Sequence, residues 1–127
     1  KADFYVLSSG EVVPSIGYRY ISESAPYIEE LVKTNRIPAN KKGTYFSFNK
    51  YDVVSPEKLQ VPHDASIRVS FDTLQIIDDI LIPNGNWGKA NYLEALAKDF
   101  PEFGVGGATQ AITKKEIIIN DVIKLSK

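Results

Sequence analysis

Apolar and polar residues alternate most regularly over residues 66–73, Ser-Ile-Arg-Val-Ser-Phe-Asp-Thr. Successive side chains of a strand point to opposite faces, so this order places Ile67, Val69 and Phe71 together on one face. Such a pattern is typical of a strand with one buried face, and it is the clearest strand signal in the chain.

A second strand is predicted over residues 17–22, which are rich in aromatic and β-branched residues. Alternation puts Tyr18 and Tyr20 on one face and Arg19 and Ile21 on the other. Arg19 therefore lies inside a strand, flanked in sequence by two tyrosines.

Shorter patterns and turn signals predict the other elements. In chain order these are a hairpin over 4–14, a helix over 24–34 with Ser24 as its cap, a strand over 44–48, a helical turn at 55–58, an extended segment over 74–82, a helix over 91–100, a strand that begins at Thr109, and a last strand within 115–125 that returns beside 109–113.

Strands and helices do not alternate regularly, which argues against a doubly wound parallel sheet. We therefore expect an α+β fold that is mostly antiparallel, with two small packed sheets and two or three short helices. The chain has 127 residues, and this length suits a single domain, 1–127, with one core.

Composition narrows the classes of function. The chain has no cysteine and a single histidine, which excludes disulfides, thiolate metal sites and His-rich metal sites. No apolar run approaches the roughly 20 residues of a membrane helix. The net charge of −1 speaks against a nucleic-acid binder, although lysines cluster at 41–42 and 114–115. The chain begins at Lys1 and contains no methionine, and we expect it to be a fragment of a longer polypeptide.

A glycine-rich segment, residues 103–113, leads into the strand at Thr109. Glycines such as Gly106 and Gly107 allow a ligand to approach the main chain closely. Thr109 and Gln110 would then present hydrogen-bonding groups at the start of the strand. The alternative is an ordinary glycine turn before an edge strand.

Two polar side chains stand inside the aromatic strands. An arginine in a strand usually pairs with an acid or binds an anion, which makes Arg19 a candidate, although an exposed edge-strand position is equally compatible. Ser47 lies between Phe46 and Phe48 and is also explained as the outward position of an amphipathic strand.

Other candidates are weaker. His63 lacks a facing carboxylate to orient it, and Asp78 and Asp79 lack further acidic residues at the spacing of a metal loop. No nucleotide-binding glycine loop, zinc motif or nucleophile elbow is present. We therefore expect no metal and no permanently bound cofactor.

The order of the polar positions resembles the ADP-ribosyltransferase superfamily. The resemblance rests on three motifs, Tyr18-Arg19-Tyr20, Tyr45-Phe46-Ser47-Phe48 and Gly106-Gly107-Ala108-Thr109-Gln110. The last of these looks most like the tuberculosis-necrotizing-toxin group of NAD glycohydrolases, in which glutamine replaces the usual glutamate. Ala108 departs from that pattern, because a third glycine is common there.

The resemblance implies an ADP-ribosyltransferase-like fold with NAD as the substrate. Arg19 would hold the NAD phosphates or ribose, Ser47 would support the nicotinamide pocket, and Gln110 would orient the nicotinamide ribose. Phe71 or Tyr45 would cover the nicotinamide ring. The remaining substrate contacts would come from Tyr18, Tyr20, Gly106, Gly107 and Thr109.

The first 20 residues also look like the start of toxin domains at the C-termini of large bacterial effectors, of the contact-dependent growth-inhibition and rearrangement-hotspot kinds. This resemblance implies a secreted or cell-surface effector whose domain enters the cytoplasm of a target bacterium. It also implies a tightly bound cognate immunity protein that keeps the toxin harmless.

Two other functions remain open. One is a toxin ribonuclease of the small barnase or colicin kind, with lysine-rich loops that bind RNA. Its candidate residues would be Arg19, Lys58, His63, Thr109 and Thr113. The other is a binding module of the effector without enzymatic activity.

Overall fold

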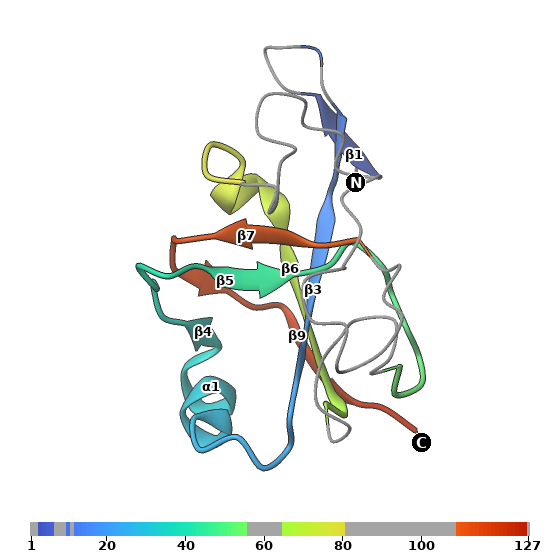
Figure 1. Ribbon diagram of the computed structural model, residues 1–127, viewed down its shortest axis with the longest axis vertical. Helices are drawn as coiled ribbons and strands as arrows, with labels where there is room; N and C mark the ends of the chain where they lie inside the picture. Colours follow the sequence, from blue (N-terminus) through green and yellow to red (C-terminus); the bar gives the residue numbers. More distant parts are fainter. Residues whose placement is uncertain (1–2, 7–9, 11, 56–64, 81–108, 127) are drawn as a thin grey trace.

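A computed structural model describes residues 3–6, 10, 12–55, 65–80 and 109–126 of the chain (Figure 1). The predicted helical turn at 55–58 and the predicted helix over 91–100 fall on or extend into segments outside the described residues. In chain order the described elements are β1 (Phe4–Val6), β2 (Val12–Pro14), β3 (Ile16–Ile21), α1 (Ile28–Thr34), β4 (Arg36–Ile37), β5 (Thr44–Phe46), β6 (Ile67–Asp72), the 3₁₀ helix η1 (Thr73–Ile76), β7 (Ala111–Thr113), β8 (Ile117–Ile118) and β9 (Asp121–Lys124).

The fold is mixed α+β and mostly antiparallel, which confirms the class expected from the sequence. Described strands form one three-stranded sheet, β3-β6-β9, and three two-stranded sheets, β1-β2, β4-β8 and β5-β7. All of these pairings are antiparallel. Among the described residues there is one α-helix, and it is too short and too polar to span a membrane.

The buried face of β6 is the one that its alternation predicts. Val69 and Phe71 are fully buried in the main core, and Ile67 packs against the same core. The ring of Phe71 meets Phe46 of β5 edge to face, with 5.2 Å between the ring centres. Since Gly17 pairs with Phe71, the absence of a side chain on β3 makes room for this ring.

The β5-β7 pair lies across β3 and β6 (Figure 1). The two sheets meet at one antiparallel bridge between Tyr18 of β3 and Ser47, the residue after β5. The N–H of Tyr18 donates to the Ser47 carbonyl at 2.7 Å, and the N–H of Ser47 donates to the Tyr18 carbonyl at 2.8 Å. This bridge brings the predicted arginine strand and the predicted serine strand side by side.

Two predicted elements differ from the structure. The apolar segment after residue 73 begins with η1 instead of a strand, because the side chain of Asp72 caps the N–H of Leu74. The last predicted strand does not return beside residues 109–113. Instead β7, within 109–113, pairs with β5, while β8 pairs with β4 and β9 pairs with β6.

The predicted helix over 24–34 starts later than its sequence signal. Ser24 is not its cap, since α1 begins at Ile28 after turns, with Tyr27 in the cap position. Its end is as expected: Asn35 takes the left-handed conformation with φ of 56°, and its N–H donates to the Leu31 carbonyl.

Candidate functional site

Ser47, Asn49 and Thr109 form a hydrogen-bonded cluster beside the bridge between the two sheets. Asn49 Oδ1 accepts from the backbone N–H of Thr109 and from the Thr109 hydroxyl, each at 2.7 Å. The Thr109 hydroxyl oxygen also accepts from the Phe48 N–H at 2.9 Å and lies 3.2 Å from Ser47 Oγ. The structure therefore brings together Ser47 and Thr109, two residues that the sequence singled out from distant segments.

Asn49 is a member of the cluster that the sequence analysis missed. Alternation from Ser47 puts Asn49 on the same face of the extended chain two residues later, so the signal was present. Nothing in the sequence indicated that its amide would reach Thr109, because that contact depends on how β5 and β7 approach each other.

Tyr20 supports this cluster from β3. Its hydroxyl donates to the Asn49 carbonyl at 2.6 Å and accepts from the Tyr51 N–H at 2.8 Å. Burial raises the pKa of Tyr20 to about 12. The Tyr20 hydroxyl therefore spans Asn49 and Tyr51, and Tyr20 has a structural role beside the cluster. The predicted contact between Tyr20 and a substrate stays a prediction.

Arg68 lies on the tyrosine face of the sheet. It pairs with Tyr20, and its guanidinium carbon stands 5.8 Å from the centre of the Tyr18 ring. Its Nη1 donates to the Tyr51 carbonyl and to Asp52 Oδ1, each at 2.8 Å. Burial is the main cause of the raised pKa of Tyr18, and the cation of Arg68 opposes it.

Arg19 and Gln110 share an unusual feature. Arg19 Nη1 donates to the Tyr45 carbonyl at 2.7 Å, but its Nε is buried with no hydrogen-bond partner among the described residues. The Oε1 atom of Gln110 is likewise buried and without a partner among the described residues. Most buried polar atoms in proteins are hydrogen-bonded, so these two atoms are exceptions that single out Arg19 and Gln110.

The two aromatic residues predicted to cover the nicotinamide ring differ in access. Phe71 is 0% exposed and packs inside the main core, so its ring cannot contact a ligand and that prediction is wrong. Tyr45 is 37% exposed and is one residue from Phe46 on β5. Of the two, Tyr45 is the one that a ligand can reach.

The structure describes only some of the remaining candidate residues. Gly106, Gly107, Lys58 and His63 lie outside the described residues. Thr113 is fully buried, and its hydroxyl donates to Asp79 Oδ2 at 2.9 Å.

Asp78 and Asp79 have structural partners. Asp79 Oδ2 also accepts from the Lys114 N–H, while Asp78 pairs with Lys115. No group of acidic or histidine side chains in the described part of the chain has the arrangement of a metal site.

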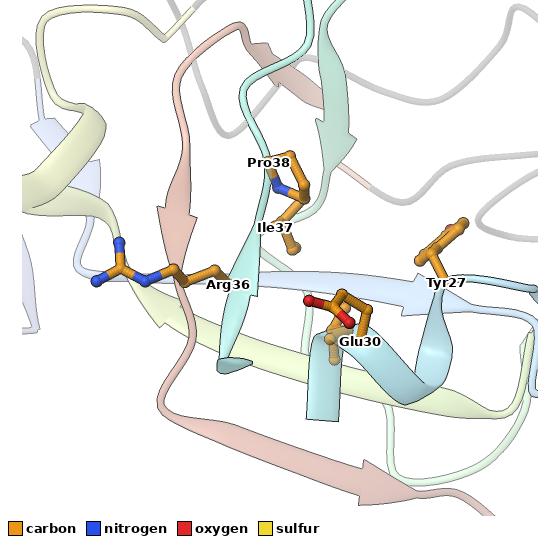
Figure 2. A pocket seen from close by; sticks show the side chains of 6 residues that line it. Tyr27, Glu30, Arg36, Ile37 and Pro38 are labelled. Carbon is orange, nitrogen blue, oxygen red and sulfur yellow. The ribbon is translucent and has the colours of Figure 1, made fainter. Parts of the chain in front are cut away.

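Two hollows of the surface are lined by other residues. One has a volume of about 370 Å³ and is lined by Ala39, Asn40, Lys41 and Lys114. The other, about 50 Å³, lies between α1 and β4 (Figure 2). It is far smaller than the several hundred Å³ of a typical ligand pocket. In Figure 2 the side chain of Arg36 points away from Tyr27 and Glu30, and it forms an ion pair with Glu116.

No protein-family model matches the chain, and no curated protein or solved structure matches it either.

Proposed function

We propose that the domain binds NAD at Arg19 and Gln110 and cleaves the bond between nicotinamide and ribose. The proposed fold is ADP-ribosyltransferase-like, and the products are free ADP-ribose or an ADP-ribosylated target. NAD is a substrate in this proposal, and no permanent cofactor takes part.

The observation that carries the proposal concerns two buried atoms, Arg19 Nε and Gln110 Oε1, which have no hydrogen-bond partner within the part of the chain that the structure describes. The first is a cationic donor, and the second is a neutral acceptor. NAD supplies the complementary groups, since its pyrophosphate oxygens accept hydrogen bonds and its ribose hydroxyls donate them. These two residues are also the ones to which the family resemblance assigns contacts with NAD.

Cleavage of NAD requires the protein mainly to position the substrate and to stabilise charge. Cleavage of the nicotinamide–ribose bond passes through an oxocarbenium-like state, as in other glycosyl cleavage. The Arg19 cation would neutralise the pyrophosphate, Gln110 would hold a ribose hydroxyl, and the Ser47 hydroxyl would support the nicotinamide amide. Gln110 has no carboxylate to activate a protein acceptor, which favours hydrolysis by water over transfer.

Purified domain incubated with NAD tests the proposal, with released nicotinamide measured by chromatography. Arg19→Ala and Gln110→Ala are each expected to lower the rate by about 100-fold or more, because each removes a group that stabilises the reacting ligand. Arg36→Ala and Gln75→Ala are the matched controls. Arg36 is half exposed in an ion pair, and Gln75 has its own backbone partners, so both variants should keep the rate.

The result also separates the competing functions. Free ADP-ribose indicates hydrolysis, and a labelled protein or RNA indicates transfer. Intact NAD beside degraded tRNA would replace this proposal with the ribonuclease, and no turnover of either substrate would favour a binding module.

The effector setting is part of the same proposal. A toxin that consumes NAD after delivery into a target bacterium must be neutralised in the cell that makes it, and the expected partner is a cognate immunity protein that covers the Arg19 and Gln110 region. Titrating such a protein into the nicotinamide assay should stop turnover at equal molar amounts. Continued turnover with the complex fully formed would contradict the expected position of the partner.

A further inference from the structure

We infer that Asn49 is the positioning residue of this site, and that its side-chain amide holds Gln110 in place through Thr109. This inference rests on the proposed function, because it assigns a role in the cleavage of NAD. Asn49 itself has no substrate contact in the proposal.

The first argument is that Thr109 is held at two points by one atom. Asn49 Oδ1 accepts from both the backbone N–H and the hydroxyl of Thr109, each at 2.7 Å. The atom that faces the backbone N–H must be the amide oxygen, because an N–H can only donate. Two bonds to one residue fix the direction of its backbone as well as its position, and Gln110 is joined to that backbone by the next peptide bond.

The second argument is that Asn49 is itself held on both sides. Its N–H donates to Ser47 Oγ at 3.0 Å, and its carbonyl accepts from the Tyr20 hydroxyl at 2.6 Å. A continuous chain of hydrogen bonds thus runs from Tyr20 on β3 through Asn49 to Thr109. Gln110 is placed relative to β3, the strand of Arg19, by this chain.

The third argument concerns the proton of Ser47. The Thr109 hydroxyl donates its hydrogen bond to Asn49 Oδ1 at 2.7 Å. The acceptors nearest to the Ser47 hydroxyl are farther away, with Thr109 Oγ1 at 3.2 Å and Asn49 Oδ1 at 3.4 Å. These are the longest contacts of the cluster and the weakest by geometry. The Ser47 hydroxyl can therefore turn its proton to a ligand without breaking the bonds that hold Thr109.

The test compares Asn49→Ala with Asn49→Asp in the nicotinamide assay. Asn49→Ala removes the acceptor, and we expect kcat to fall about 100-fold with KM changed by less than about 3-fold, since misplacement of a reacting group by about 1 Å costs this much. Asn49→Asp keeps an acceptor oxygen at the same place, so it should recover at least about a tenth of the wild-type kcat. Asn40→Ala is the matched control, because Asn40 also bonds a backbone N–H, that of Lys42, but in an exposed turn.

Hydrogen exchange at the Thr109 amide, measured by NMR on the same proteins, gives a readout that does not depend on catalysis. Faster exchange at Thr109 in Asn49→Ala, with exchange in the neighbouring strand β7 unchanged, would support the inference together with the loss of kcat. An active wild type beside an equally active Asn49→Ala would overturn the positioning role alone. An inactive wild type would overturn the proposed function, and the positioning role with it.

Discussion

Arg68 lies directly opposite Tyr20 in the antiparallel pairing of β6 with β3. The arginine that accompanies the two tyrosines of β3 is therefore on the neighbouring strand, while Arg19 points to the other face. Only about a tenth of the Arg68 side chain is exposed, whereas its ionic partner Asp52 is largely in solvent. A buried cation with an exposed counter-ion makes this part of the fold sensitive to the charge of Asp52.

Protonation of Asp52 should therefore weaken the fold at acidic pH. The hydrogen bond from Arg68 is the largest cause that lowers the pKa of Asp52 below its ordinary value of 3.8. A carboxyl with a lowered pKa in the folded state adds stability that is fully present above its unfolded pKa and is lost as the pH falls through its folded pKa. We expect the free energy of unfolding of Asp52→Asn to be less than that of the wild type at neutral pH and to fall less steeply below pH 3.8.

Denaturant unfolding across this pH range provides the measurement. Asp121→Asn is the control, since Asp121 is an exposed carboxylate with no ion pair among the described residues. If the free energy of unfolding falls equally steeply at acidic pH in the wild type and in Asp52→Asn, the ion pair with Arg68 has no part in acid stability.

The two glutamines Gln110 and Gln75 should respond in opposite ways to the same substitution. Gln75 donates to the carbonyls of Asp72 and Ile118 and accepts from the Ile118 N–H, so Gln75→Met should lower the free energy of unfolding by about 1 kcal/mol. Gln110→Met keeps the length of the side chain and removes a buried acceptor without a partner among the described residues. It should leave the free energy of unfolding unchanged or raise it by up to about 1 kcal/mol.

Chemical denaturation of both variants checks this contrast. A stabilised but inactive Gln110→Met is the pattern expected of a residue kept for a ligand at the expense of stability. A loss for Gln110→Met equal to that for Gln75→Met would mean that Gln110 is a structural residue.

The sequence predicted where strands form more reliably than which strands pair with each other in a sheet. Alternation over 66–73 is a local property of one segment, and the buried face of β6 follows from it. The partner of the last strand is not local, because residues 117–118 and 121–124 bond to different strands. The N–H of Asn120, which lies between these two segments, donates to the Ser70 carbonyl.

The same distinction separates the predicted site residues from the missed ones. The hydrogen-bonding capacity of Ser47 and Thr109 could be seen in the sequence, and the structure brings them together. The position of Arg68 opposite Tyr20 depends on the register between two strands that are distant in sequence, which alternation does not give. The resemblance implies that Phe71 or Tyr45 covers the nicotinamide ring, but the strand face of Phe71 directs its ring into the core.

Tyr20→Phe should destabilise the fold, because it leaves the Asn49 carbonyl and the Tyr51 N–H without their shared partner. We expect a loss of about 1–3 kcal/mol in the free energy of unfolding at neutral pH. Since the folded pKa of Tyr20 is raised from 10.0 to about 12, its contribution is fully present below pH 10.0 and is lost as the pH rises through 12. The stability difference between wild type and Tyr20→Phe should therefore narrow across this alkaline range.

An ultraviolet difference titration of these two proteins checks the pKa directly, because the phenol missing from the variant should titrate near pH 12. Tyr27→Phe is a suitable control, since Tyr27 is 45% exposed. A missing phenol that titrates near its ordinary pKa of 10.0 would contradict the buried, hydrogen-bonded position of Tyr20.

Gly17→Ala tests the contact between β3 and the core beneath it. A Cβ atom on Gly17 would lie 2.4 Å from Cζ of Phe71, a separation that no relaxed structure tolerates. The Phe71 ring is fully buried and packs edge to face on Phe46, so it has no free space to move into. We expect the free energy of unfolding to fall by roughly 1–3 kcal/mol through overpacking.

A double-mutant cycle with Phe71→Leu shows whether this clash is the cause. Leucine is shorter than phenylalanine, so the added methyl group should cost less in Phe71→Leu than in the wild type, with a coupling free energy of at least about 0.5 kcal/mol. Strictly additive losses would mean that the added methyl group disturbs β3 by another route. Because Gly17 directly precedes Tyr18 and Arg19, the same cycle measured by nicotinamide release reports how far the core beneath β3 controls the proposed site.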